Sequence, residues 1–287
     1  MFDPMLDVIH VDEKWFNADK DKRSYLVFED EKPPPRFFKS KRFIPKTMFL
    51  AAFARPRHDL HRNAYWDGIL GVWAFTEEYT AQRASRNRAK GTTCVRNLPT
   101  IDRIVYKSYL LEYLFPAIKE KWPRKDQHHL IWVQQDNAKP HVSPFDLEVL
   151  AAGSESGWNI RLTFQPPNSP DINVCDLGLF AFLQSLQYRK YMRNVLDIVK
   201  AVQEAYEEMS KDTLNNIFLT LQSCMRCVLE NDGGNDYKLP HLGKAKLRNT
   251  GALPLVLPCK KDLYNRAVSA LAQATQGGAL FFSASTS

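Results

Sequence analysis

Cysteines, long apolar runs and a leader-like N-terminus are scarce or missing in this sequence. Its 287 residues include five cysteines, too few and too scattered to suggest a disulfide framework in a chain this long. Apolar runs such as residues 48–54 are too short to span a bilayer. The N-terminus has Asp3 and Asp7 where a secretory signal would be basic and then apolar. We therefore expect a soluble protein of a reducing compartment, with no membrane partner.

Cations outnumber acidic groups. Lys and Arg total 39 against 32 Asp and Glu, which gives a formal net charge of +7. This balance favours polyanionic partners without selecting one, and a merely soluble basic protein would have it too. With 44% hydrophobic residues, the chain can bury a sizeable core, either as one large domain or as two.

The spacing of apolar residues predicts an α/β chain. Apolar and aromatic runs between turn residues predict strands at residues 8–11, 23–29, 47–54, 130–133 and 160–165. Helical spacing predicts a long helix over 101–122, with Thr100 as its N-cap, and a helical hairpin formed by the stripes 195–209 and 214–228. Residues 271–287 end in a small and polar stretch, so we expect a disordered tail there.

Three aspartates occupy positions that suit chemistry. Asp12 and Asp136 each follow a short apolar strand, where open α/β sheets expose functional groups to a crevice. Asp176 follows the proline-rich turn 166–170 and begins an apolar helical segment. Together they could bind two divalent cations about 3.5 to 4 Å apart, as phosphoryl transfer requires. Taken singly, each is better explained as a strand end, a turn residue or a helix cap.

The residues around these aspartates resemble motifs of mariner-like transposases. The three motifs are VDEKWF at 11–16, QDNAKPH at 135–141, and NSPDIN at 168–173 leading to DLG at 176–178. The 39 residues between Asp136 and Asp176 are similar in number to the spacing in the plant-type branch of that family. The similarity is sharpest over about 7–186 and continues loosely to about 267.

This resemblance implies an α/β fold of the ribonuclease H-like kind, a mixed five-stranded sheet flanked by helices. The family's catalytic and metal-binding aspartates would be Asp12, Asp136 and Asp176, with two Mg²⁺ ions for which Mn²⁺ can substitute. Glu13 and Asp171 adjoin these motifs without an assigned metal role. The implied domains are a catalytic domain over 1–190 with a basic insertion at about 56–100, and a C-terminal helical extension over 191–270.

The implied activity is metal-dependent cleavage of transposon ends, followed by strand transfer to a TA target, in cut-and-paste DNA transposition. Double-stranded DNA is the implied partner, the nucleus is the implied compartment, and a homodimer is allowed. Family members have N-terminal helix-turn-helix modules that recognise transposon ends, and no such pattern precedes Asp12. The alternative is therefore a truncated or domesticated transposase-derived protein that binds DNA or another partner without transposition.

Two segments concentrate cations. No acidic residue lies between Ala81 and Arg96, and we expect a basic loop here rather than a strand or helix. Its cations are Arg83, Arg86, Arg88, Lys90 and Arg96. The position of this loop before the long helix favours DNA-phosphate contact over a solvated surface. A second group (Arg36, Lys39, Lys41, Arg42), interleaved with phenylalanines, fits a DNA-backbone grip and strand-edge packing equally well.

Two further features have competing explanations. Cys224 and Cys227 have the spacing of zinc ligands, but they lie in a helical stripe without a second pair, which favours packed thiols. His141 fits a residue that orients a carboxylate, a DNA contact and a surface histidine, and we leave it outside the catalytic set.

Overall fold

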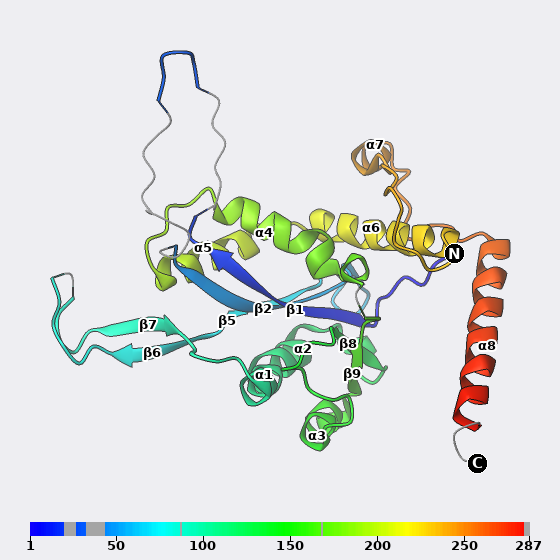
Figure 1. Ribbon diagram of the computed structural model, residues 1–287, viewed down its shortest axis with the longest axis horizontal. Helices are drawn as coiled ribbons and strands as arrows, with labels where there is room; N and C mark the ends of the chain where they lie inside the picture. The colour runs from blue at the N-terminus through cyan, green and yellow to red at the C-terminus, as the bar shows by residue number, and fades with distance from the viewer. Residues whose placement is uncertain (20–26, 33–43, 87, 168, 284–287) are drawn as a thin grey trace.

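The computed structural model describes residues 1–19, 27–32, 44–86, 88–167 and 169–283. Its centre is a five-stranded sheet in the order β5-β2-β1-β8-β9 (Figure 1). The strands are β1 (Val8–Asn17), β2 (Lys46–Ala54), β5 (Ile69–Ala74), β8 (Ile131–Gln135) and β9 (Ile160–Phe164). The pairs β1–β2 and β2–β5 are antiparallel, whereas β1–β8 and β8–β9 are parallel. The predicted mixed five-stranded sheet is confirmed.

Helices cover both faces of this sheet (Figure 1). One layer contains α1 (Arg103–Tyr109), a π-helical turn (Leu110–Leu114), α2 (Phe115–Lys121) and α3 (Leu147–Ser154). The other contains a second π-helical turn (Cys175–Leu179), α4 (Phe180–Gln187), α5 (Val195–Glu207) and α6 (Lys211–Glu230). The chain ends with α7 (Lys244–Asn249) and α8 (Lys261–Ser283), and short 3-10 turns span Arg124–Asp126, Glu155–Gly157 and Pro170–Ile172. No helix in the described part of the chain is long and apolar enough to cross a membrane.

The central strand β1 contributes side chains to two separate cores. Successive side chains of a strand point to opposite faces of the sheet. Ile9 and Val11 therefore pack with the α1–α2 layer, whereas Phe16 packs with the α4–α6 layer. Phe16 makes edge-to-face contacts there with Phe49 and Phe180. This burial on both faces explains why Val8, Ile9 and Val11 at the start of β1 are all apolar.

The predicted end of the first strand at Asp12 is wrong. β1 continues to Asn17, because β2 pairs with it without interruption from Ile9–Ala54 to Asn17–Lys46. Its parallel pairing with β8 ends earlier, at His10 and Gln134. Asp12 thus lies within a strand but beyond the last residue pair that joins β1 to β8.

The third strand of the antiparallel part is β5, not the segment 23–29. Residues 23–26 lie outside the described residues, and 27–29 form no strand. β5 lies within the predicted basic insertion at 56–100, where it follows a turn at Gly68 with φ +77°. A Cβ on Gly68 would lie 2.1 Å from the Ala54 carbonyl oxygen, so this turn requires glycine. The buried side chain of Leu70 then joins the core.

The rest of that insertion forms two hairpins. The first pairs β3 (Arg57–Asp59) with β4 (Ala64–Trp66), and the second pairs β6 (Thr76–Thr80) with β7 (Thr93–Asn97). Figure 1 shows the β6–β7 hairpin extending away from the sheet. The expectation of a loop up to Arg96 is therefore wrong at its end, because Thr93–Asn97 obtains cross-strand hydrogen bonds from β6.

The predicted helices agree with the structure except at their ends. Asp102, rather than Thr100, caps α1, because its carboxylate accepts hydrogen bonds from the backbone N–H groups of Ile104 and Val105. The predicted helical hairpin is α5 and α6. The structure has helix α8 through Ser283 where a disordered tail was predicted from residue 271. Alanines within this segment, such as Ala272 and Ala274, favour helix strongly.

Gly153 provides a test of the packing that holds β9 beside β8. A Cβ added to this α3 residue would lie 2.4 Å from the carbonyl oxygen of Ile160, the first residue of β9. Gly153→Ala should therefore destabilise the fold by about 1–3 kcal/mol, despite the better helix propensity of alanine. Thermal unfolding followed by circular dichroism measures the change. Ala151→Ser, at an exposed position of the same helix, should stay within about 0.5 kcal/mol, and an unchanged Gly153→Ala midpoint would contradict this packing.

Candidate metal centre

The candidate site forms where β1 and β8 separate. Asp12 and Asp136 each lie two residues beyond the last pair of these strands, His10 and Gln134. β8 ends at Gln135 and the chain turns away, whereas β1 continues along β2. Asp12 and Asp136 therefore line one pocket of about 230 Å³. The other lining residues are Glu13, Met48, Ile101, Tyr106, Ala138, Pro140 and His141.

The Asp12 carboxylate is held by two donors. It is 7% exposed. The backbone N–H of Glu13 donates to Oδ1 at 2.7 Å, and Asn173 Nδ2 donates to Oδ2 at 2.8 Å. Asn173 is itself fixed, because its Oδ1 accepts from the Cys175 backbone N–H at 2.9 Å. These bonds attach the loop before Asp176 directly to the first aspartate.

Asp176 lies in the π-helical turn at the start of α4 and is exposed. Its charge acts on Asp12. Burial raises the pKa of Asp12 to about 8, the charges of Asp176, Glu13 and Asp136 contribute to the rise, and the hydrogen bond from Glu13 N–H opposes it. The structure thus brings the three predicted aspartates into one electrostatic neighbourhood.

A divalent cation fits this neighbourhood by charge and donor type. Carboxylate oxygens are the ligands that hard cations such as Mg²⁺ prefer. Burial, and after it the charges of the neighbouring carboxylates, raise the pKa of Asp12. Within the described ranges, no group of three His, Cys, Asp or Glu side chains stands ready to hold an ion. Asp12 and Asp136 line the same pocket, whereas Asp176 is not among its lining residues. Metal binding by Asp12, Asp136 and Asp176 together therefore stays a prediction.

Asp171, the other carboxylate of the third motif, has a different partner. The Tyr237 hydroxyl donates a hydrogen bond to Asp171 Oδ2. Burial raises the pKa of Tyr237 beyond its usual range, and the bond to Asp171 adds to the rise. The chain after α6 thus returns to contact the turn Pro170–Ile172, and Asp171 takes part in that contact.

His141 lines the pocket, although it was not predicted from the sequence as a site residue. It is 4% exposed, and its ring stacks on Tyr106 with centroids 4.4 Å apart. Nδ1 lies 2.8 Å from Asp136 Oδ1, and Nε2 lies 3.1 Å from Glu13 Oε2. Burial would lower the pKa of His141, but the hydrogen bonds and charges of Glu13 and Asp136 outweigh it and raise the pKa to about 9.

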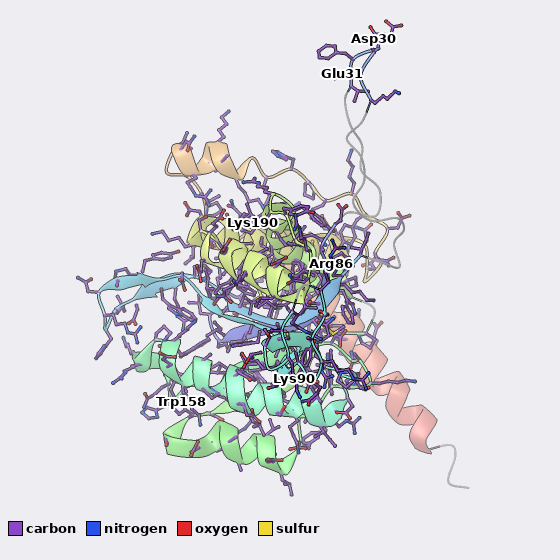
Figure 2. The ribbon with its side chains drawn as sticks, turned by 90° about the vertical axis from the view of Figure 1, so that its left-hand side faces the viewer. Asp30, Glu31, Arg86, Lys90, Trp158 and Lys190 are labelled. Carbon is purple, nitrogen blue, oxygen red and sulfur yellow. The ribbon has the colours of Figure 1, made fainter. Side chains whose placement is uncertain are left out.

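The predicted DNA-binding cations lie on the β6–β7 hairpin. Arg88 donates to the Tyr79 hydroxyl at 2.8 Å, and Arg96 pairs with Glu77 at 2.8 Å, so both have partners within the hairpin. The remaining cations of this set are exposed: Arg83, Arg86 and Lys90. Figure 2, in which the hairpin points toward the viewer, labels Arg86 and Lys90.

Of two other groups that the sequence singled out, one can be placed. The basic group at 36–42 lies outside the described residues. Cys224 and Cys227 are buried on α6, and burial raises the pKa of both thiols.

Known proteins with this fold define its class. No family model matches the chain. Solved structures of the Mos1 mariner transposase share its fold, which confirms the predicted ribonuclease H-like class and the resemblance to mariner transposases at the level of the fold. A pre-cleavage Mos1 transpososome has a TM-score of 0.54 and 18% identity, with 81% of this chain and 58% of that chain covered. A Mos1 paired-end complex with Mn has a TM-score of 0.53 and 18% identity, with 82% and 57% covered.

One curated relative is similar in sequence. The human histone-lysine N-methyltransferase SETMAR is 24% identical over 230 residues, which cover 78% of this chain and 28% of that protein. The chain thus spans between about a quarter and three fifths of the length of the proteins it matches. The match with SETMAR assigns no methyltransferase activity to this chain.

The raised pKa of Asp12 predicts that the stability of the fold depends on pH and on the neighbouring carboxylates. Because the folded-state pKa of Asp12 is raised from 3.8 to about 8, ionising it disfavours the folded state, and this cost grows between about pH 4 and pH 8. Asp176→Asn removes a neighbouring charge, so without divalent metal its thermal midpoint at pH 8.5 should exceed that of wild type by a few degrees. Differential scanning fluorimetry in EDTA measures this change.

The same variant should respond less to added Mn²⁺. Ions that bind the folded state raise the unfolding midpoint, and removal of the Asp176 carboxylate deprives them of one ligand. Asp171→Asn is the matched control, because its amide oxygen can still accept from Tyr237. We expect the control to respond to Mn²⁺ like wild type. Equal responses of Asp176→Asn and wild type would remove Asp176 from the metal site.

Proposed function

We propose that this chain is the catalytic domain of a mariner-like DNA transposase, a metal-dependent endonuclease and strand transferase that acts on transposon ends. The observation that supports this best is the meeting of Asp12 and Asp136 where β1 separates from β8, with the charge of Asp176 acting on Asp12. The fold shared with Mos1 structures, among them complexes with a transposon end and with Mn, supports the same proposal.

In this proposal Asp12, Asp136 and Asp176 would hold two Mg²⁺ ions. When bound, the ions would activate the attacking hydroxyl group and stabilise the leaving oxygen of the phosphodiester; Mn²⁺ can substitute. Before metal binds, the crowded carboxylates repel a DNA phosphate, which accounts for metal dependence. Asn173 keeps Asp12 aimed at the site by donating to its Oδ2. No covalent bond between enzyme and DNA is required.

Duplex DNA, both transposon ends and a TA target, is the proposed substrate. The net charge of +7 and the exposed cations of the hairpin favour contacts with phosphates. Two ends are cut and joined in the proposed reaction, so we also propose a homodimer with one site for each end. The nucleus is the compartment that this substrate implies.

A second candidate is a transposase-derived protein that binds DNA or another partner without cutting DNA. One observation favours it: across the described residues, no group of three ligand side chains is arranged for an ion. Activity separates the two candidates, because a DNA-binding protein needs no metal-dependent cleavage.

A cleavage assay tests the proposed enzyme directly. Supercoiled plasmid is incubated with protein and Mn²⁺, and nicked and linear products are measured. Asp136→Asn should lower the rate at least about 100-fold, because a metal ion supplies several kcal/mol and each 1.4 kcal/mol is about tenfold. Asp136 is partly exposed and contributes no core packing, so circular dichroism should be unchanged.

The same assay assigns the third carboxylate. Asp176→Ala should lose activity, whereas Asp171→Ala should keep it, because the Asp171 carboxylate accepts a hydrogen bond from Tyr237 instead. The reverse result would transfer the third metal-binding role to Asp171. Wild-type protein that binds duplex DNA but never cuts it would favour the second candidate.

DNA binding should depend steeply on salt. Each phosphate contact on duplex DNA contributes about −0.9 to the slope of log affinity against log salt. Replacing Arg83, Arg86 and Lys90 together by alanine should weaken binding and make the slope shallower by about 0.9 for each phosphate that is no longer neutralised. Fluorescence anisotropy across a salt series measures both quantities.

A variant in which the same amount of charge is removed elsewhere is the control. Arg124, Lys125 and Lys200 are exposed cations outside the hairpin. Their joint replacement by alanine should leave a slope close to that of wild type. A hairpin variant whose slope matches this control would show that the hairpin does not contact phosphates.

A further inference from the structure

We propose that His141 is a positioning residue that aims the Asp136 carboxylate at the metal site, and that Glu13 anchors His141 rather than binding metal. This inference rests on the proposed function, because it concerns the same site. It is carried by the contacts of one buried ring with two carboxylates from distant parts of the chain, 128 residues apart for Glu13 and His141.

The alternation of β1 separates Asp12 from Glu13. Asp12 points toward the α4–α6 layer, where Asn173 donates to it. Glu13, the next residue, points toward the α1 layer, where both of its carboxylate oxygens lie 3.1 and 3.2 Å from His141 Nε2. The adjacent carboxylates of Asp12 and Glu13 thus contact different partners, Asn173 and His141.

The His141 ring is held by contacts with several parts of the chain. Its backbone N–H donates to the Ala138 carbonyl at 3.0 Å, which closes a turn after Asp136. One face stacks on Tyr106, whose hydroxyl donates to Gln135 Oε1 at 3.2 Å. Gln135 Nε2 in turn donates to the Val142 carbonyl at 2.6 Å. The ring is therefore held by α1, by the end of β8 and by the loop that contains it.

This fixed ring determines which oxygen of Asp136 is available. Oδ1 accepts from the Ala138 backbone N–H at 2.8 Å and faces His141 Nδ1, also at 2.8 Å. Oδ2 accepts no hydrogen bond from the described part of the chain. His141 Nδ1 is also 2.9 Å from the Asp136 backbone carbonyl oxygen, which accepts its hydrogen bond. With Oδ1 bonded to the Ala138 N–H and beside the His141 ring, Oδ2 is the oxygen presented to a metal ion. Partners of this kind that orient a ligating carboxylate typically affect metal affinity about 10–100-fold.

Two conservative variants separate the two nitrogens of the ring. The amide nitrogen of His141→Asn can replace Nδ1, and that of His141→Gln can replace Nε2. Mn²⁺ affinity is measured by isothermal titration, independently of cleavage. We expect His141→Ala and His141→Gln to weaken Mn²⁺ binding at least about tenfold, and His141→Asn to bind Mn²⁺ nearly as tightly as wild type. His129→Ala, at an exposed histidine paired with Asp126, should bind like wild type.

A double-mutant cycle assigns the role of Glu13. If Glu13 acts only through His141, then Glu13→Ala should weaken binding no further in the His141→Ala background. A further weakening of about tenfold would make Glu13 a metal ligand and overturn that part of the proposal. Glu13→Gln, which keeps an acceptor for Nε2, should bind Mn²⁺ more tightly than Glu13→Ala.

Cleavage separates failure of this inference from failure of the proposed function. At saturating Mn²⁺, His141→Ala should regain most of the wild-type cleavage rate, because the defect lies in metal affinity. If wild-type protein binds Mn²⁺ but cuts no DNA, the proposed endonuclease activity is refuted. The Mn²⁺ titrations would still decide whether His141 positions Asp136. If wild-type protein cuts DNA and His141→Ala or His141→Gln binds Mn²⁺ as tightly as wild type, the inference about His141 is overturned while the proposed function stands. If His141→Ala does not fold, the comparison of His141→Asn with His141→Gln decides the outcome.

Discussion

Repulsion among carboxylates in a partly buried pocket is the constraint on which the rest of this site depends. Burial raises the pKa of Asp12 to about 8, and the charges of Asp176, Glu13 and Asp136 add to the rise. The protein offsets this repulsion only in part, with backbone N–H groups, one amide and His141. Negative charge that remains uncompensated is the property that makes the pocket suited to divalent cations.

The sheet creates this crowding by its geometry. β1 is buried between two layers of helices, so consecutive residues on it must face different layers. Asp12 consequently meets Asn173 from the α4 side, whereas Glu13 meets His141 from the α1 side. Separation of β8 from β1 after Gln134 opens the space between the layers. Asp136 enters this space from the end of β8, so the site needs no long flexible loop to assemble its first two aspartates.

The C-terminal part of the chain supports this arrangement from a distance. α6 packs beside the π-helical turn of Asp176, and Tyr237 beyond it contacts Asp171 in the preceding turn. Arg55, which follows β2 and is fully buried, donates to the carbonyl oxygens of Pro4 and Leu255, so that the N-terminal residues and the segment before α8 meet there. The two domains predicted from the sequence, 1–190 and 191–270, are therefore joined by contacts such as that of Tyr237 with Asp171.

The sequence by itself determined the elements whose signal is local. Apolar runs and helical stripes predicted β1, β2, β8, β9 and the α5–α6 hairpin, and the motifs around Asp12, Asp136 and Asp176 predicted the fold and the candidate ligands. Only the tertiary structure decided what depends on partners distant in the chain. β5, which the sequence did not predict, is a strand because it pairs with β2. The contact of Glu13 with His141 has no local signal, since 128 residues separate them and only strand alternation and the packing of α1 bring them together.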